Sequence, residues 1–137
     1  MSDMTKRYKK KEEESGVRLI TLLQTQGSEI LKREADNDHF IHLYCTGPYW
    51  VAFEKSAYLL HQIAPAALVT PMGFTTYPFP VVMVCWTDEE LRAYCRNHLF
   101  HQVGDDYCRL AVTPLSISGF REWHRQVVSD LMVNAFC

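Results

Sequence analysis

Hydrophobic positions in the first half of the chain change from a helical to a strand-like spacing. Over residues 17–31 they fall on one face of a helix, with Gly27-Ser28 as a point of interruption. Residues 40–45 alternate and include aromatic and β-branched side chains, which is typical of a strand. Gly47-Pro48 then marks a turn, after which residues 49–53 return as a second strand. The sequence therefore predicts a helix followed by a hairpin.

The middle of the chain continues with a helix, an edge segment and a buried strand. Residues 55–63 have the length and spacing of a helix that ends before Pro65. Residues 69–80 contain prolines, which cannot donate to a sheet ladder, so this segment is expected to be a loop or a sheet edge. Residues 81–86 form a nearly continuous apolar run, which indicates a strand buried on both faces at the centre of the sheet.

The last third of the chain repeats the pattern of helix and strand. Thr87 and the three acidic residues after it predict a helix start, because a hydroxyl cap and carboxylates suit the free amides and the positive end of the helix dipole. This helix is expected to reach about Phe100, followed by a strand over residues 107–112 and a helix over residues 119–133 capped by Ser118. Strands and helices alternate, so the predicted class is α/β or α+β, with a mixed β-sheet flanked by helices.

Composition fits one globular domain with a charged tail. The chain has 137 residues, of which 47% are hydrophobic and 22% are charged, enough apolar surface to bury a core. We therefore expect a single domain over residues 17–137, preceded by a charged, flexible tail over residues 1–16. The formal net charge of −2 gives no overall attraction for polyanions and counts against strong DNA binding.

A block of basic residues in this tail adjoins a block of acidic ones. Lys9, Lys10 and Lys11 follow two further basic residues and are followed at once by residues 12–14, all glutamate. Neighbouring blocks of opposite sign largely cancel, so we interpret the segment as a solvated tail or a helix start. The alternative is a basic arm that gains affinity for phosphates through counterion release.

The cysteines and the hydropathy of the chain predict where in the cell the protein is found. The five cysteines are odd in number and irregular in spacing, so reduced thiols are expected. Nothing at the amino end resembles a signal peptide, and no apolar run approaches the roughly 18 residues of a membrane span. These features predict a cytoplasmic protein without a membrane partner.

Candidate metal and catalytic residues are few. Cys95, His98 and His101 are spaced by three residues, and Cys108 is an additional zinc ligand in principle. A paired Cys-x-x-Cys is absent from the sequence, and histidines near a helix carboxyl end favour the dipole, so the structural interpretation is preferred. The sequence also lacks a nucleophile elbow and a phosphate loop. We therefore predict a non-enzyme without catalytic residues, bound metal or cofactor.

The hairpin and the helix after it resemble the amino-terminal mismatch-recognition domain of the MutS family of DNA mismatch-repair proteins. In that family an apolar run leads to Gly-Asp-Phe-Tyr-Glu, an apolar residue and Phe, then to a helix opened by an acid and Ala. Gly47, Phe53 and Ala57 coincide with this pattern. Residues 91–94 and 109–112 are similar to a later helix and strand of the family. The resemblance covers roughly residues 18 to 113.

The resemblance implies a stand-alone MutS domain I-like protein that binds DNA without ATPase activity, since the family's ATPase, connector and clamp regions have no counterpart in it. The family's stacking phenylalanine and the glutamate two residues later fall at Tyr49 and Val51. Tyr49 can still stack on a base, whereas Val51 cannot hydrogen-bond. Nucleic-acid contacts are therefore assigned to Tyr49, Trp50 and the basic residues Lys9, Lys10 and Lys11.

Two alternatives remain open for the hairpin and for the protein. Tyr49 and Trp50 are otherwise ordinary strand residues, one packing inward and one partly exposed, while Phe53 is expected in the core. The second functional class is a protein-interaction or structural module that keeps the fold, has lost the DNA contacts and self-associates through an apolar patch around residues 77–80.

Overall fold

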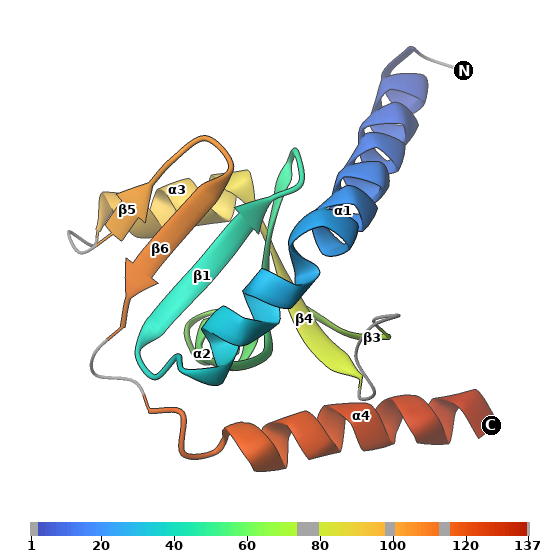
Figure 1. Ribbon diagram of the computed structural model, residues 1–137. Helices are drawn as coiled ribbons and strands as arrows, with labels where there is room; N and C mark the ends of the chain where they lie inside the picture. The colour runs from blue at the N-terminus through green and yellow to red at the C-terminus, as the bar shows by residue number, and fades with distance from the viewer. Residues whose placement is uncertain (1–2, 74–79, 98–100, 113–115, 137) are drawn as a thin grey trace.

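The computed structural model describes residues 3–73, 80–97, 101–112 and 116–136, with side chains described for these except residues 3–13, 101–103 and 131–136. The chain forms four helices and six strands within this part (Figure 1). Their bounds are α1 Asp3–Ala35, β1 Phe40–Cys45, β2 Tyr49–Phe53, α2 Glu54–Ile63, β3 Leu68–Met72, β4 Val81–Thr87, α3 Asp88–Arg96, β5 His101–Val103, β6 Tyr107–Ala111 and α4 Phe120–Phe136.

One sheet with the order β3-β4-β2-β1-β6-β5 forms the centre of the molecule. Its helices and strands confirm the predicted class. Every pairing between the described strands is antiparallel, so the expectation of a mixed sheet is corrected. The strands β2 and β3 run parallel to each other, but they do not pair because β4 lies between them and is antiparallel to both.

The two outer strands include one predicted element and one that the sequence pattern did not indicate. β3 is an edge strand, as the prolines suggested, and Pro71 pairs with Val82 in the register. β5, at the other edge, was not predicted. β4 is second from the edge rather than at the centre. Its apolar run over residues 81–84 is buried because helices cover both faces of the sheet at this strand.

The helices form a layer on each face of the sheet, and the core lies in two parts. On one face α1 packs through Ile30 against residues such as Phe53 and Met83. On the other face the core contains Leu59 and Leu60 of α2 and Leu91 of α3, with Trp123 of α4 packed against it. Figure 1 shows α4 along the end of the sheet that is opposite the hairpin turn.

The first helix is longer than predicted. It begins at Asp3 and continues without a break through Gly27-Ser28 to Ala35, so the charged segment forms its first turns. One glycine inside a helix costs about 1 kcal/mol, which burial of a long apolar face offsets. Ser15 Oγ donates to Thr46 Oγ1 at 3.1 Å and ties α1 to the hairpin turn, beyond which its first turns project (Figure 1).

The remaining elements lie close to their predicted positions. Thr87 caps α3 by accepting a hydrogen bond from the Glu90 N–H at 3.1 Å, as predicted. The helix ends at Arg96, earlier than expected, and Phe100 lies outside the described residues. The final helix begins at Phe120, which places Gly119 rather than Ser118 directly before it. None of the described helices combines the length and the apolar character that a membrane span requires.

Candidate functional site

The hairpin residues assigned to nucleic-acid contact lie in different surroundings. Tyr49 opens β2, pairs with Thr87 and is half-buried. Trp50 lies between Cys45 and Trp86 in the register and is only 4% exposed. Its indole N–H donates to Asp88 Oδ1 at 2.9 Å, so its polar atom is satisfied inside the protein. The assignment of Trp50 as a contact residue is therefore corrected, because its ring packs inward.

The other hairpin side chains belong to the core. Val51 is 1% exposed and Phe53 is fully buried, both on the face covered by α1. The prediction that Phe53 is a core residue is confirmed. Gly47 has a φ of 102°, a conformation that glycine adopts at little cost and that turns β1 into β2.

Acidic residues surround the exposed end of the hairpin. The Asp88 N–H donates to Pro48 O at 2.9 Å, which brings the first turn of α3 beside the hairpin turn. This turn contains Asp88, Glu89 and Glu90, and hydrogen bonds from Trp50 and Arg92 lower the pKa of Asp88, which keeps it charged. These acids oppose a phosphate backbone beside the hairpin turn, although Arg18 also lies next to Gly47 of this turn.

The basic block and the candidate zinc ligands are only partly placed. Lys9, Lys10 and Lys11 lie in α1, with side chains outside the described part. His98 and the side chain of His101 also lie outside it. Among the described residues no cluster of three or more histidine, cysteine, aspartate or glutamate side chains could hold a metal ion.

A second surface lies on the face of the sheet that α1 flanks. Alternate residues of neighbouring strands share a face, so β1 and β6 place Phe40, His42, Tyr44, Tyr107 and Arg109 together. Arg33 of α1 reaches over two of these rings. We call these six residues the aromatic–arginine face.

Two guanidinium groups cover the rings of this face. Arg33 Cζ lies 5.2 Å from the centroid of the Tyr107 ring, and Arg33 Nη1 donates to Tyr44 Oη at 2.7 Å. Arg109 Cζ lies 4.6 Å from the centroid of the Phe40 ring. Both arginines are exposed, while Phe40 and Tyr107 are half-buried. Contacts of this kind hold a guanidinium over a ring and leave its other side open to a partner.

The electrostatics of the aromatic–arginine face are dominated by these arginines. Burial lowers the pKa of His42 to about 4, and the charges of Arg33 and Arg109 lower it further in the same direction. His42 is therefore neutral at pH 7. Its Nδ1 lies 2.6 Å from Tyr107 Oη. Burial also raises the pKa of Tyr107, so its phenol stays protonated. The charges of the face at neutral pH are therefore those of Arg33 and Arg109.

A groove of about 450 Å³ adjoins this face, between α1 and the strands β1 and β6. Its wall on α1 contains the exposed residues Arg18, Thr21, Thr25 and Gln26, and its floor includes Tyr107. Arg18 Nη2 lies 3.6 Å from Asp106 Oδ1, and both side chains are largely exposed. An ion pair of this kind contributes little to stability, so Arg18 can exchange Asp106 for another anion.

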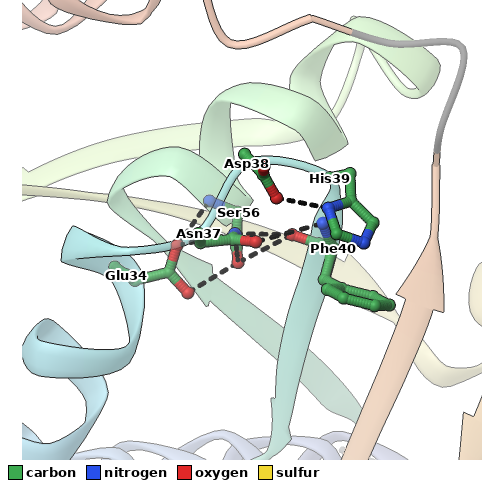
Figure 2. Close-up of polar contacts among 6 residues, drawn as sticks. All are labelled: Glu34, Asn37, Asp38, His39, Phe40 and Ser56. Atoms are coloured by element: carbon green, nitrogen blue, oxygen red, sulfur yellow. Dashed lines mark hydrogen bonds and ion pairs between the residues drawn. The ribbon is translucent and has the colours of Figure 1, made fainter.

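A buried polar cluster joins the end of α1 to the start of α2 (Figure 2). Glu34 accepts hydrogen bonds from the Ser56 N–H at 2.7 Å and from Ser56 Oγ at 2.6 Å. Asn37 Nδ2 donates to Phe40 O at 2.6 Å and to Glu34 Oε1 at 3.2 Å. Burial raises the pKa of Glu34 to about 7 despite these bonds. The carboxylate caps α2 from another helix, which makes this cluster a structural joint.

A second ionisable pair fixes α4. His124 Nε2 lies 3.0 Å from Glu54 Oε1, which also accepts the Val82 N–H at 2.8 Å. Glu54 has a backbone φ of 52°, a left-handed conformation that is strained for any residue other than glycine. The carboxylate thereby reaches both β4 and α4 from the start of α2. Both contacts connect elements of the fold, and we assign the pair a structural role.

Sequence reasoning missed Arg33, Tyr107 and Arg109. The signal was present, because Tyr107 and Arg109 are alternate residues of a predicted strand and so share one face. The sequence pattern did not show that α1 leaves the surface around Tyr107 and Arg109 uncovered. Comparisons with protein families, curated proteins and solved structures found no match for the chain.

Proposed function

We propose that this protein is a non-enzymatic, MutS domain I-like module that binds DNA weakly through the aromatic–arginine face. The observation that carries the proposal is the placement of Arg33 and Arg109 over the rings of Tyr107 and Phe40. The resemblance of the hairpin and the following helix to a mismatch-recognition domain supports DNA binding, although it assigns the contacts to the hairpin and not to this face. A cytoplasmic location, where Cys45, Cys85, Cys95 and Cys108 would stay free thiols, is part of the proposal.

Guanidinium groups and aromatic rings suit both parts of a nucleotide. A guanidinium plane pairs with phosphate oxygens through two parallel hydrogen bonds and also stacks on bases. A ring provides a stacking surface for any base, so the contact is tolerant of sequence. The proposal therefore expects binding without strong sequence preference. Tyr49, which is half-buried beside the acidic turn of α3, makes at most a secondary contact in this arrangement.

The net charge of −2 and the acids beside the hairpin limit the affinity. The arginines of the face are near enough to DNA to act at short range, while the rest of the molecule repels it. Binding should consequently be weak and should fall steeply as salt is raised.

The proposal is tested by fluorescence anisotropy with labelled matched and mismatched duplexes over a range of salt concentrations. Arg109→Gln should make the slope of log affinity against log salt less steep by about 0.9, as expected for one lost contact with duplex phosphate. Arg96→Gln is the matched control, because it removes the same charge from α3 on the other face of the sheet. A flat response with both duplexes and single strands at low salt would overturn the proposal.

The alternative is a protein-interaction module. Val17 and Ile20 favour it, because they are 62% and 56% exposed on α1. The apolar patch predicted around residues 77–80 lies largely outside the described residues. Of these four residues only Pro80 is described, and it is half-buried. Sedimentation velocity with wild type and Val17→Lys tests this alternative, which requires a concentration-dependent dimer that the substitution dissociates.

A further inference from the structure

We infer that the groove between α1 and β6 receives a single polynucleotide strand in preference to a duplex. This inference rests on the DNA-binding function proposed above and names the form of nucleic acid that the site takes. The observations behind it are the shape of the groove, the chemistry of its wall and the position of Tyr107 on its floor.

The wall of the groove on α1 carries two arginines. Arg18 and Arg33 lie on the same side of α1 and both line the groove. They are 15 positions apart, which at 1.5 Å per residue is about 22 Å along the helix axis. The two guanidinium groups lie closer together than this, because Arg18 contacts Asp106 and Arg33 lies over the ring of the next residue, Tyr107, so they can hold phosphates of neighbouring nucleotides. The groove volume of about 450 Å³ between them fits inserted bases rather than a whole duplex.

The wall of the groove offers partners for the edges of unpaired bases. Thr21 Oγ1 and Thr25 Oγ1 donate to the carbonyl oxygens of Val17 and Thr21, at 2.9 and 2.7 Å. Each hydroxyl oxygen therefore keeps acceptor capacity that a base amino group can use. The Gln26 side chain is exposed in the same wall and carries both a donor and an acceptor. In a duplex the Watson–Crick edges of the bases are hidden by pairing.

The ring of Tyr107 provides the stacking surface at the floor. It is half-buried, lies under Arg33 and is held by the contact of its hydroxyl with His42. Arg33 covers one side of this ring, and the rings of Tyr44 and His42 are its neighbours. A base therefore stacks on it by displacing Arg33 and by leaving its own stack, which a single strand allows at little cost. A duplex would reach the arginines at the rim with its phosphates and leave Tyr107 unused.

The line of the groove continues along α1 beyond the sheet. Position 11 precedes position 18 by two helical turns and position 7 precedes it by three, so both lie in line with Arg18 on the helix. The sequence has lysine at position 11 and arginine at position 7. A strand leaving the groove past the hairpin turn would therefore first pass Glu14, one turn before Arg18, and then reach these basic positions.

The test compares short fluorescein-labelled oligothymidylate and oligouridylate strands with a duplex of the same length, using the full chain at low salt. We expect the single strands to bind at least about tenfold more tightly than the duplex. Tyr107→Leu should weaken single-strand binding by about 5- to 150-fold, the loss of one stacked base, and should weaken duplex binding much less. Arg18→Gln should weaken single-strand binding and reduce its salt slope by about 0.7.

Two controls separate stacking from folding. Tyr107→Phe removes the hydroxyl and its contact with His42 but keeps the ring, so it should bind single strands like the wild type. Arg96→Gln removes one charge outside the groove and should also bind normally. Far-ultraviolet circular dichroism and thermal melts show whether each variant is folded.

The outcomes distinguish this inference from the proposed function. Equal affinity for strand and duplex, with both lowered by Arg109→Gln, would overturn the inference and leave the DNA-binding proposal standing. Absence of binding to every probe would overturn both. Equal binding of the thymidylate and uridylate strands supports the inference, because the groove recognises bases and phosphates and not the 2′-hydroxyl.

Discussion

Neighbouring side chains of β2 point to opposite faces of the sheet, and helices cover both faces, so only the start of the strand can meet a partner. Tyr49 is half-buried at the start of the strand, whereas Trp50 packs between Cys45 and Trp86. The hydrogen bond from Trp50 to Asp88 joins β2 to the first turn of α3. Trp50 therefore acts within the fold by holding α3 against the sheet.

Trp50→Phe should destabilise the protein by about 2 kcal/mol without changing DNA affinity. The substitution removes a hydrogen bond to a charged acceptor, which contributes about 1.5–3 kcal/mol, and leaves a smaller ring in the core. Urea denaturation measures the loss, and anisotropy with labelled oligonucleotides measures binding. A variant of unchanged stability that binds less tightly would show that the indole contacts DNA, contrary to its burial.

Glu34→Gln should remove part of the pH dependence of stability. The pKa of Glu34 is raised from 4.5 to about 7 in the folded protein, so between these values the folded state holds its proton more firmly than the unfolded state. The free energy of unfolding of the wild type therefore decreases as pH rises through this window, by up to about 3 kcal/mol. Glutamine keeps an acceptor for the Ser56 N–H and does not ionise.

The measurement is the difference in unfolding free energy between wild type and Glu34→Gln in urea at pH 5 and at pH 8. The difference is needed because His42 changes the free energy of unfolding in the opposite direction. Its pKa is lowered in the folded state, so stability is lost as pH falls from 6.5 towards about 4. This term is common to both proteins and cancels. Parallel stability curves for the two proteins would mean that Glu34 ionises normally in the folded state.

At the scale of elements, the helices are joined at their ends. Lys55 Nζ donates to Ala35 O at 2.8 Å, while Glu34 accepts from the Ser56 N–H, so α1 and α2 each satisfy free groups at the other's terminus. The final helix is held differently, by His124 and by aromatic contacts. Tyr58 lies 5.4 Å from Trp123 and 6.2 Å from Phe120 between ring centroids.

Gly119→Ala should loosen α4. A methyl group at this position would overlap Tyr58 Oη, and the ring of Tyr58 is confined by Phe120 and Trp123. Relieving this overlap should cost about 1–3 kcal/mol, as for other additions to a packed site. Faster amide hydrogen exchange over residues 120–136 and altered tryptophan fluorescence would report it.

The matched control for this variant is Gly16→Ala. A Cβ at position 16 has no neighbour within 4 Å, and the residue lies inside α1. Alanine there should stabilise the protein by about 0.5–1 kcal/mol through helix propensity alone. A loss of stability in Gly16→Ala as large as that in Gly119→Ala would show that the contact with Tyr58 is not the cause.

Across the whole molecule, local patterns predicted the elements, and packing between distant elements decided the rest. The hairpin, the Thr87 cap and the core position of Phe53 follow from spacing and backbone chemistry within a few residues. The burial of Trp50 does not, because alternation separates the two faces of the sheet without showing that helices cover both of them at β2. The aromatic–arginine face also depends on where α1 lies across the sheet, which brings Arg33 to Tyr107 over 74 positions of sequence.

Charge is likewise divided between regions of the molecule that distant segments create. Acidic residues of α3 lie beside the hairpin turn, while Arg33 and Arg109 lie on the face flanked by α1. The net charge of −2 averages over these regions. A polyanion within a Debye length, about 8 Å at physiological salt, experiences the local field rather than the average.

Asp106→Asn and Asp130→Asn distinguish a local field from net charge. Each adds one positive unit, but Asp106 lies 3.6 Å from Arg18 in the groove, whereas Asp130 belongs to α4, the helix that Figure 1 shows at the end of the sheet opposite the hairpin turn. Asp106→Asn should raise the affinity for a single strand about 3- to 10-fold, since it frees Arg18 for phosphate and removes a repulsive charge. Asp130→Asn should change it less than about twofold, and high salt should abolish the difference because screening weakens both effects. Equal gains from the two variants would mean that the chain attracts nucleic acid through its overall charge, and the groove would lose its special role.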